Sequence, residues 1–239
     1  MPKNVEKMTF NYSPNFDLKK RDKSKIKYLI YHYTGMKSEK GALRRLTNIN
    51  SNVSCHYFIK KNGEIIKIVP ELYVAWHAGI SFWKKDRSLN KKSIGIEISN
   101  PGHQNGYLNF SKTQINSVIL LSKKIIKKYK ISKFNILGHS DISPLRKKDP
   151  GEKFPWQYLS ENNISIWHKI NKKISKKTRY KKINNQIKFL KLLSKFGYIF
   201  SENELEKIKI IKSFQRRFRP ELVNGIIDQE CYLILKSLI

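Results

Sequence analysis

The period of the apolar residues changes once along the chain, and this change constrains the fold more than any other feature. Up to residue 138, short segments rich in β-branched and aromatic residues, typical of strands, alternate with segments of helical period. Beyond residue 184 only the helical period remains. We therefore predict an α/β fold with a central mixed β-sheet flanked by helices, followed by a small all-α three-helix domain.

Turn chemistry and capping place the segments of the first part. Asn62-Gly63 predicts a tight hairpin, because this pair readily supplies the positive φ that such turns need. Ser111 is a suitable N-cap for a long helix with one apolar stripe. Residues 139–157 predict a long loop, and loops of that length are usually functional. The predicted strands are 26–34, 55–60, 64–69, 94–99 and 134–138, and the predicted helices are 39–48, 112–129 and 163–174.

Irregular segments bound this first part. The polar residues 1–24 predict an extended lead-in, and the charged, non-periodic run 175–182 predicts a linker. Gly197 and Asp228 suit the end of one later helix and the N-cap of another. We therefore predict a first domain at 1–178 and a helical domain at 179–239, with helices at 184–196, 202–218 and 228–238.

The chain is strongly basic, with 49 Lys and Arg against 18 Asp and Glu and a formal net charge of +31. Such a charge favours polyanionic partners: nucleic acid, anionic lipid or an anionic cell-wall polymer. The basic residues are mostly lysines spread along the whole chain, however, and a compositional bias of the host genome produces the same pattern. Because no compact arginine-rich block or nucleic-acid motif is present, we expect no nucleic-acid partner.

Cysteine usage and hydropathy bear on the compartment. Cys55 and Cys231 lie far apart and form no disulfide framework. No segment is apolar for long enough to be a signal peptide or a membrane span. We therefore expect a cytoplasmic protein without a membrane span, and a monomer.

Three residues have the chemistry of a catalytic zinc site. His32 lies near the end of the first strand, His139 directly follows a short strand, and Asp149 lies ten residues further on. Two imidazoles and a carboxylate leave one coordination position open for water. A lone histidine is more often only a polar residue, and an aspartate before Pro-Gly often forms a turn. From spacing alone, a metal site and a structural role are equally supported.

Hydrolysis also needs a proton shuttle and a positive group near the developing oxyanion. Glu97 interrupts an apolar strand, where a buried carboxylate is costly unless it is paired or used. Alternatively, Glu97 lies on the solvated face of an edge strand. Lys147 lies two residues before Asp149 and could stabilise the oxyanion, although most lysines in such a chain are surface groups.

Five segments, taken in order, resemble the zinc-dependent N-acetylmuramoyl-L-alanine amidases, a family that includes phage T7 lysozyme-like amidases and the peptidoglycan recognition proteins. The resemblance extends over about residues 15–175 and implies one Zn²⁺ held by His32, His139 and Asp149. It also implies Glu97 as the acid/base that activates water and Lys147 as the group that stabilises the oxyanion. No ligand position is substituted, unlike in metal-free recognition homologues. The segments are Ile30–Thr34, Val53–Ile59, Ala75–Gly79, Ser93–Glu97 and His139–Gly151.

The resemblance implies hydrolysis of the amide bond between N-acetylmuramic acid, or its 1,6-anhydro form, and L-alanine of the peptidoglycan stem peptide. Peptidoglycan or a muropeptide is then the partner, in cell-wall turnover or recycling. Tyr33 and His77 are candidate substrate contacts, although a buried structural role suits His77 equally well. The alternative is a non-catalytic peptidoglycan-binding protein.

The tail resembles a three-helix peptidoglycan-binding domain, through Phe214-Gln215 and the segment 225–228. Phe214 and Phe218, four residues apart, also suit the core of a helical bundle, so wall binding is inferred from the resemblance alone. A wall-binding tail favours the periplasm or cell envelope as the alternative compartment.

Overall fold

The computed structural model describes residues 8–239, so the first seven residues of the predicted lead-in lie outside the described part. The chain forms two compact units, one made of residues up to 79 together with 88–137, the other of 80–87 with 138–239. The second unit thus begins inside the predicted first domain, 1–178, and the domain boundaries stay a prediction. Within residues 8–239, no helix combines the length and the apolar character needed to cross a membrane.

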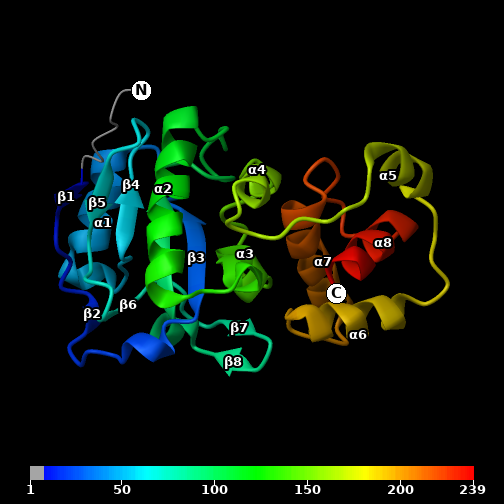
Figure 1. The fold of residues 1–239 in the computed structure, drawn as a ribbon, viewed down its shortest axis with the longest axis horizontal. Helices are drawn as coiled ribbons and strands as arrows, with labels where there is room; N and C mark the ends of the chain where they lie inside the picture. The colour runs from blue at the N-terminus through cyan, green and yellow to red at the C-terminus, as the bar shows by residue number, and fades with distance from the viewer. Residues whose placement is uncertain (1–7) are drawn as a thin grey trace. The chain divides into compact units, whose positions relative to one another are not determined.

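A six-stranded mixed sheet, in the order β1-β5-β4-β9-β3-β10 and flanked by helices as predicted, is the centre of the first unit (Figure 1). β9 pairs in parallel with both β3 and β4, whereas β4 and β5 are antiparallel. Gly63 has a φ of +85° in the turn between β4 and β5, which confirms the predicted hairpin. The strands are β1 (Met8–Phe10), β3 (Tyr28–Tyr33), β4 (Tyr57–Ile59), β5 (Ile65–Lys67), β9 (Ser93–Ile98) and β10 (Ile136–Gly138).

One face of the sheet packs against α2 (Lys112–Tyr129), which lies in front of the sheet in Figure 1. Tyr31 of β3 points to this face, because its hydroxyl is 2.7 Å from the Ser122 hydroxyl of α2. Ser111 caps α2 and forms a capping box with Gln114, as its position before the apolar stripe predicts. The long helix therefore begins and ends at the residues that the sequence indicates.

The opposite face packs against α1 (Glu39–Thr47). Phe58 of β4 lies in one apolar cluster with Ala42 and Leu46 of α1. Glu97 is the register partner of Phe58 on one side and of His32 on the other. Residues opposite each other in a sheet project to the same face, so His32 and Glu97 lie on the face that α1 partly covers.

Short elements complete the first unit. The predicted lead-in is not wholly irregular, because β1 adds to the sheet edge through parallel pairing with β5. A second pair, β2 (Phe16–Asp17) with β6 (Val74–Ala75), is antiparallel. The 3₁₀ helices are η1 (Lys23–Lys25), η2 (Ile49–Ser51), η3 (Leu89–Lys92) and η4 (Lys133–Asn135).

The second unit is mainly helical. The three predicted helices are confirmed, with Gly197 ending α6 at a φ of +149° and the Asp228 side chain capping α8. Phe214 and Phe218 are fully buried, which confirms that they belong to the core. The elements are the hairpin β7 (Phe82–Trp83) and β8 (Asp86–Arg87), followed by α3 (His139–Ile142), α4 (Trp156–Glu161), α5 (Lys172–Thr178), α6 (Gln186–Phe196), α7 (Glu204–Phe218) and α8 (Gln229–Leu238).

The predicted linker 175–182 and the predicted helix 163–174 are wrong in part, because the linker is helical up to Thr178 and the predicted helix is helical only from Lys172. Helix α5 extends through the first half of the charged run, and Arg179 after it forms an ion pair of 2.7 Å with the buried Glu230 of α8. Arg219 also donates to Glu230, at 3.3 Å. A charged run is ordered here because a distant carboxylate pairs with it, and a local pattern does not contain that information.

The predicted loop 139–157 is also wrong in part, since it contains α3 and the first residues of α4. The side chain of Asp141 accepts a hydrogen bond of 2.7 Å from the backbone N–H of Gly138 and so closes a helical turn. This turn begins at His139. It therefore determines the backbone from which one of the predicted metal ligands projects.

Candidate metal centre

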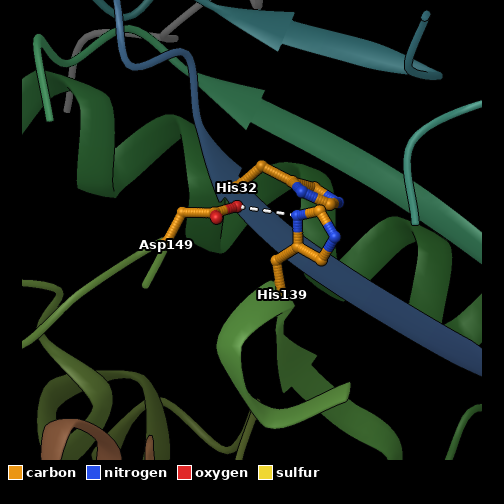
Figure 2. Close-up of side chains that lie close together, drawn as sticks. All are labelled: His32, His139 and Asp149. Atoms are coloured by element: carbon orange, nitrogen blue, oxygen red, sulfur yellow. Dashed lines mark hydrogen bonds and ion pairs between the residues drawn. The ribbon is translucent and has the colours of Figure 1, made fainter. Parts of the chain in front are cut away.

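The three predicted ligands come together. His32 is the fifth residue of β3, His139 is the first residue of α3 and follows β10, the neighbour of β3 in the sheet, and Asp149 lies in the segment after α3. All three are buried, and each offers one ligand atom within 4.8 Å of the other two. Figure 2 shows their side chains converging. Among the described residues, this is a group that can hold a metal ion.

Asp149 and His139 are in direct contact. The Nδ1 atom of His139 lies 3.0 Å from Oδ2 of Asp149, as the dashed line in Figure 2 marks. The backbone N–H of Ser140 donates to the Asp149 carbonyl at 2.8 Å, so the loop is tied to the turn that carries His139. Both side chains are almost completely shielded from solvent. A bound cation would neutralise the buried carboxylate and accept a lone pair from the imidazole, so the two side chains suit a metal ion.

A chain of hydrogen bonds determines which nitrogen of His32 faces the centre. The Ser93 hydroxyl donates to the Leu89 carbonyl at 2.7 Å, so it accepts from Nε2–H of His77, 3.1 Å away. In neutral His77 the other nitrogen, Nδ1, is then an acceptor, and it lies 3.0 Å from Nε2 of His32. His32 therefore donates from Nε2, so the nitrogen that can ligate a metal is Nδ1.

The surroundings of His77 are closely packed. A Cβ at Gly95 would lie 2.5 Å from the imidazole of His77, so only glycine is compatible with the ring at that position. The ring of His56 packs edge-on to His77 at 5.6 Å, and its Nδ1 accepts from the N–H of Gly95 at 3.0 Å. Burial, and then the positive charge of Arg21, lower the pKa of His56 well below its usual value. His56 is thus a neutral packing partner that holds His77 in place.

Glu97 lies beside His32, because the two residues are register partners on adjacent strands. β9 has a neighbour on each side, β4 and β3, so the alternative of a solvated edge strand is wrong. The residue is partly buried and its Oε2 atom is inaccessible to solvent. A carboxylate therefore lies on the same face of the sheet as the metal ligand His32.

The other predicted site residues do not belong to the group of three ligands. Lys147 is partly exposed in the segment between α3 and Asp149, and its backbone N–H donates to the Ser143 carbonyl at 3.0 Å. The Tyr33 hydroxyl lies 2.9 Å from Nδ1 of His103. Tyr33 follows His32 in β3 and packs over Gly102, where a Cβ would come within 2.5 Å of its ring. The roles of Lys147, Tyr33 and His77 stay predictions.

Sequence reasoning missed Arg146 and Asp141. The Arg146 guanidinium donates to the Ile80 carbonyl at 2.9 and 3.2 Å, and its Nη2 lies 3.4 Å from Nε2 of His139. The spacing of Gly138 and Asp141 is that of a capping pattern and could have indicated the helical turn. Nothing local indicates Arg146, because its partner at residue 80 is distant in sequence.

Comparisons with known proteins identify the family. Residues 22–152 match the family model described as N-acetylmuramoyl-L-alanine amidase. The chain is also 36% identical over 232 residues to the N-acetylmuramoyl-L-alanine amidase AmiD of Escherichia coli K12, covering 90% of this chain and 83% of AmiD. The chain belongs to the N-acetylmuramoyl-L-alanine amidase family. This confirms the resemblance that the five sequence segments indicate.

Solved amidase structures share the fold. An E. coli AmiD complex superimposes with a TM-score of 0.80 at 36% identity, covering 90% of this chain and 88% of that one. AmpDh3 from Pseudomonas aeruginosa superimposes with a TM-score of 0.81 at 30% identity, covering 90% and 91%. The 1,6-anhydro-N-acetylmuramyl-L-alanine amidase AmpD of Haemophilus influenzae is 35% identical over 167 residues, 62% of this chain and 88% of AmpD. The predicted fold, a mixed sheet with flanking helices and a helical C-terminal part, is confirmed.

Proposed function

We propose that this amidase hydrolyses the bond between the lactyl carbonyl of N-acetylmuramic acid, or of its 1,6-anhydro form, and the nitrogen of L-alanine. The observation that carries the proposal is the convergence of three buried ligand atoms, from His32, His139 and Asp149, within 4.8 Å. The substrate class is supported by two relatives. The AmiD structure contains anhydro-N-acetylmuramic acid-L-Ala-D-γ-Glu-L-Lys, and an AmpDh3 structure contains an anhydromuramic pentapeptide.

We propose that the ion is zinc, one per chain. Tetrahedral zinc, with bonds of about 2.0–2.1 Å, places its ligand atoms about 3.3 Å apart. The 3.0 Å between His139 Nδ1 and Asp149 Oδ2 fits that spacing. Two imidazoles and one carboxylate would leave the fourth coordination position of the ion open. Zinc held by these three residues would supply a Lewis acid at neutral pH.

Side chains of the protein then transfer the protons and stabilise the charge of the oxyanion. Glu97, on the same face of the sheet as His32, accepts a proton from the attacking water and delivers it to the departing amine of L-alanine. Lys147 supplies positive charge for the oxyanion that develops on the lactyl carbonyl oxygen. One C–N bond breaks and one C–O bond forms, so a single water is consumed.

His77 acts in this proposal as a positioning residue rather than as a substrate contact. Its two ring nitrogens lie within hydrogen-bond distance of His32 and Ser93, so it holds His32 in the tautomer that presents Nδ1. Residues that orient a metal ligand in this way typically account for a 10- to 100-fold difference in metal affinity.

Replacing His77 should therefore weaken zinc binding. We expect His77→Leu to lower zinc affinity by about 10- to 100-fold, because His32 loses its acceptor. His77→Asn, whose amide oxygen can still accept, should recover part of the loss. Zinc affinity is measured by competition with a chelator, and the His32 tautomer by ¹⁵N NMR of the metal-free chain. A substrate contact would instead raise KM and leave zinc affinity unchanged.

We propose that the enzyme acts on cell-wall material during turnover or recycling. The peptidoglycan-binding role of the C-terminal helices remains part of this proposal, as does a monomeric state. The cytoplasm is the proposed compartment, with the periplasm or cell envelope as the alternative if intact wall is the substrate.

Mass spectrometry of reaction products tests the proposal. The full chain is incubated with an anhydro-muropeptide and, in parallel, with intact sacculi. We expect free stem peptide that begins with L-alanine, and a sugar product, whose masses sum to the substrate plus one water. Cleavage at another bond would contradict the proposal. Saturable binding of the same muropeptide without products would support the alternative, a non-catalytic peptidoglycan-binding protein.

A further inference from the structure

The helical turn that carries His139 is held by residues far along the chain. α3 has only four residues, which is too short to be stable by itself. Its Asp141 accepts at Oδ2 from the Gly138 N–H, 2.7 Å away, and from Nη1 of Arg217, 2.6 Å away. Tyr198 donates to the other oxygen, Oδ1, at 2.5 Å. Arg217 belongs to α7 and Tyr198 follows α6, so both come from the helical C-terminal part.

A second connection reaches the same turn. The Ser213 hydroxyl of α7 donates to the carbonyl of Ser140, the residue after His139, at 2.6 Å. Ser213 and Arg217 are four residues apart and so lie on one face of α7. Arg217 also lies 4.4 Å above the ring of Trp156, at the start of α4. One face of α7 thus contacts the turn at two successive points, Ser140 and Asp141.

These contacts are buried, and one of them, between Arg217 and Asp141, is an ion pair. Arg217 and Asp141 are each 1% exposed, and Ser213 and Tyr198 are fully buried. Burial, and then the charge of Asp141, raise the pKa of Tyr198 well above its usual value, so its hydroxyl stays a donor. A buried ion pair adds little stability compared with apolar packing, but it restricts geometry because its partners must be satisfied. Here the restricted group is the carboxylate that bonds to the N–H just before His139.

We propose that the C-terminal helices are a structural part of the metal centre and position His139 through Arg217, Ser213 and Tyr198. This role is separate from any wall binding by the same helices. The test of this proposal by zinc affinity rests on the proposed zinc function. The backbone order of the turn does not, because the hydrogen bond from the Gly138 N–H to Asp141 involves none of the three metal ligands.

Two arginines of similar burial provide a matched test. Arg219, two residues after Arg217, is also 1% exposed and pairs with Asp228 at 2.5 Å, but no bond of its side chain reaches α3 among those resolved in residues 8–239. In the full chain, we expect Arg217→Lys to lower zinc affinity by about tenfold or more, as is typical for residues that support a ligand. The Gly138 amide should also exchange hydrogen faster. Arg219→Lys should leave both unchanged.

Milder variants cover the case in which Arg217→Lys does not fold. Tyr198→Phe and Ser213→Ala each remove one hydroxyl, and their combination should weaken zinc binding and Gly138 protection in the same direction. Unchanged zinc affinity and unchanged Gly138 exchange in a folded Arg217→Lys chain, or in the double variant, would overturn the proposal. Equal losses in Arg217→Lys and Arg219→Lys would also overturn it. If the natural chain binds no zinc, the proposed function fails, and the exchange measurement alone decides this inference.

Discussion

Removal of zinc should abolish hydrolysis, and one zinc ion per chain should restore it. In the metal-free chain the Asp149 carboxylate and the His139 imidazole still contact each other at 3.0 Å, so the residues that would hold a Lewis acid remain but the Lewis acid itself does not. Activity is measured at buffered free zinc concentrations, after the metal content has been determined. We expect activity to rise in proportion to bound zinc and to reach a maximum at one ion per chain.

Magnesium is the control for this experiment. It prefers oxygen ligands and octahedral geometry, so a site with two imidazoles should not be restored by it. Asp149→Asn keeps the size of the side chain but removes its charge, and should lower zinc affinity and activity together. Full activity in a chain that is verified to be metal-free would refute the zinc mechanism.

Glu97→Gln should lose about 10²- to 10⁴-fold in turnover, the range that general acid–base catalysis contributes. Glutamine matches glutamate in size but cannot take a proton from water at neutral pH. Because Glu97 is not one of the three ligands that converge in the centre, zinc should still bind at one per chain. The measurements are kcat and KM on a muropeptide, together with zinc stoichiometry.

Glu71→Gln is a suitable control, since Glu71 is another buried carboxylate of the first unit. Its side chain accepts from Tyr57 and Tyr129, each at 2.6 Å, and it pairs with Lys128. This substitution should reduce stability without reducing the turnover of the folded enzyme. If Glu97→Gln keeps its turnover, or loses it only because zinc is lost, Glu97 is not the acid/base.

The elements that local chemistry specifies could be predicted closely. Helix α2 begins after Ser111 as its capping box indicates, and the hairpin forms at Asn62-Gly63. Helices α6 to α8 follow their apolar period. In each case neighbours within a few residues of one another set the backbone, so the pattern is present in a short window of sequence.

Segments that depend on distant partners could not be predicted. The charged run 175–182 predicts a linker, yet Arg179 within it pairs with Glu230 and the run is ordered. The segment after Gly138 has the composition of a loop, yet Asp141 closes a helical turn there and pairs with Arg217, 76 residues later. A single window of sequence contains one partner of each such pair and not the other.

The same distinction between local patterns and distant partners applies to the candidate metal centre. The sequence by itself determined the fold class through its apolar periods. It determined the amidase family and the three residues that converge through the resemblance of five segments, since spacing alone left a structural role equally supported. Only the tertiary structure showed that His77 contacts His32, that Glu97 lies on a central strand, and that α7 contacts the turn of His139. The His32–His77 and Asp141–Arg217 contacts join residues 45 and 76 positions apart, and their geometry exists only once the chain has folded.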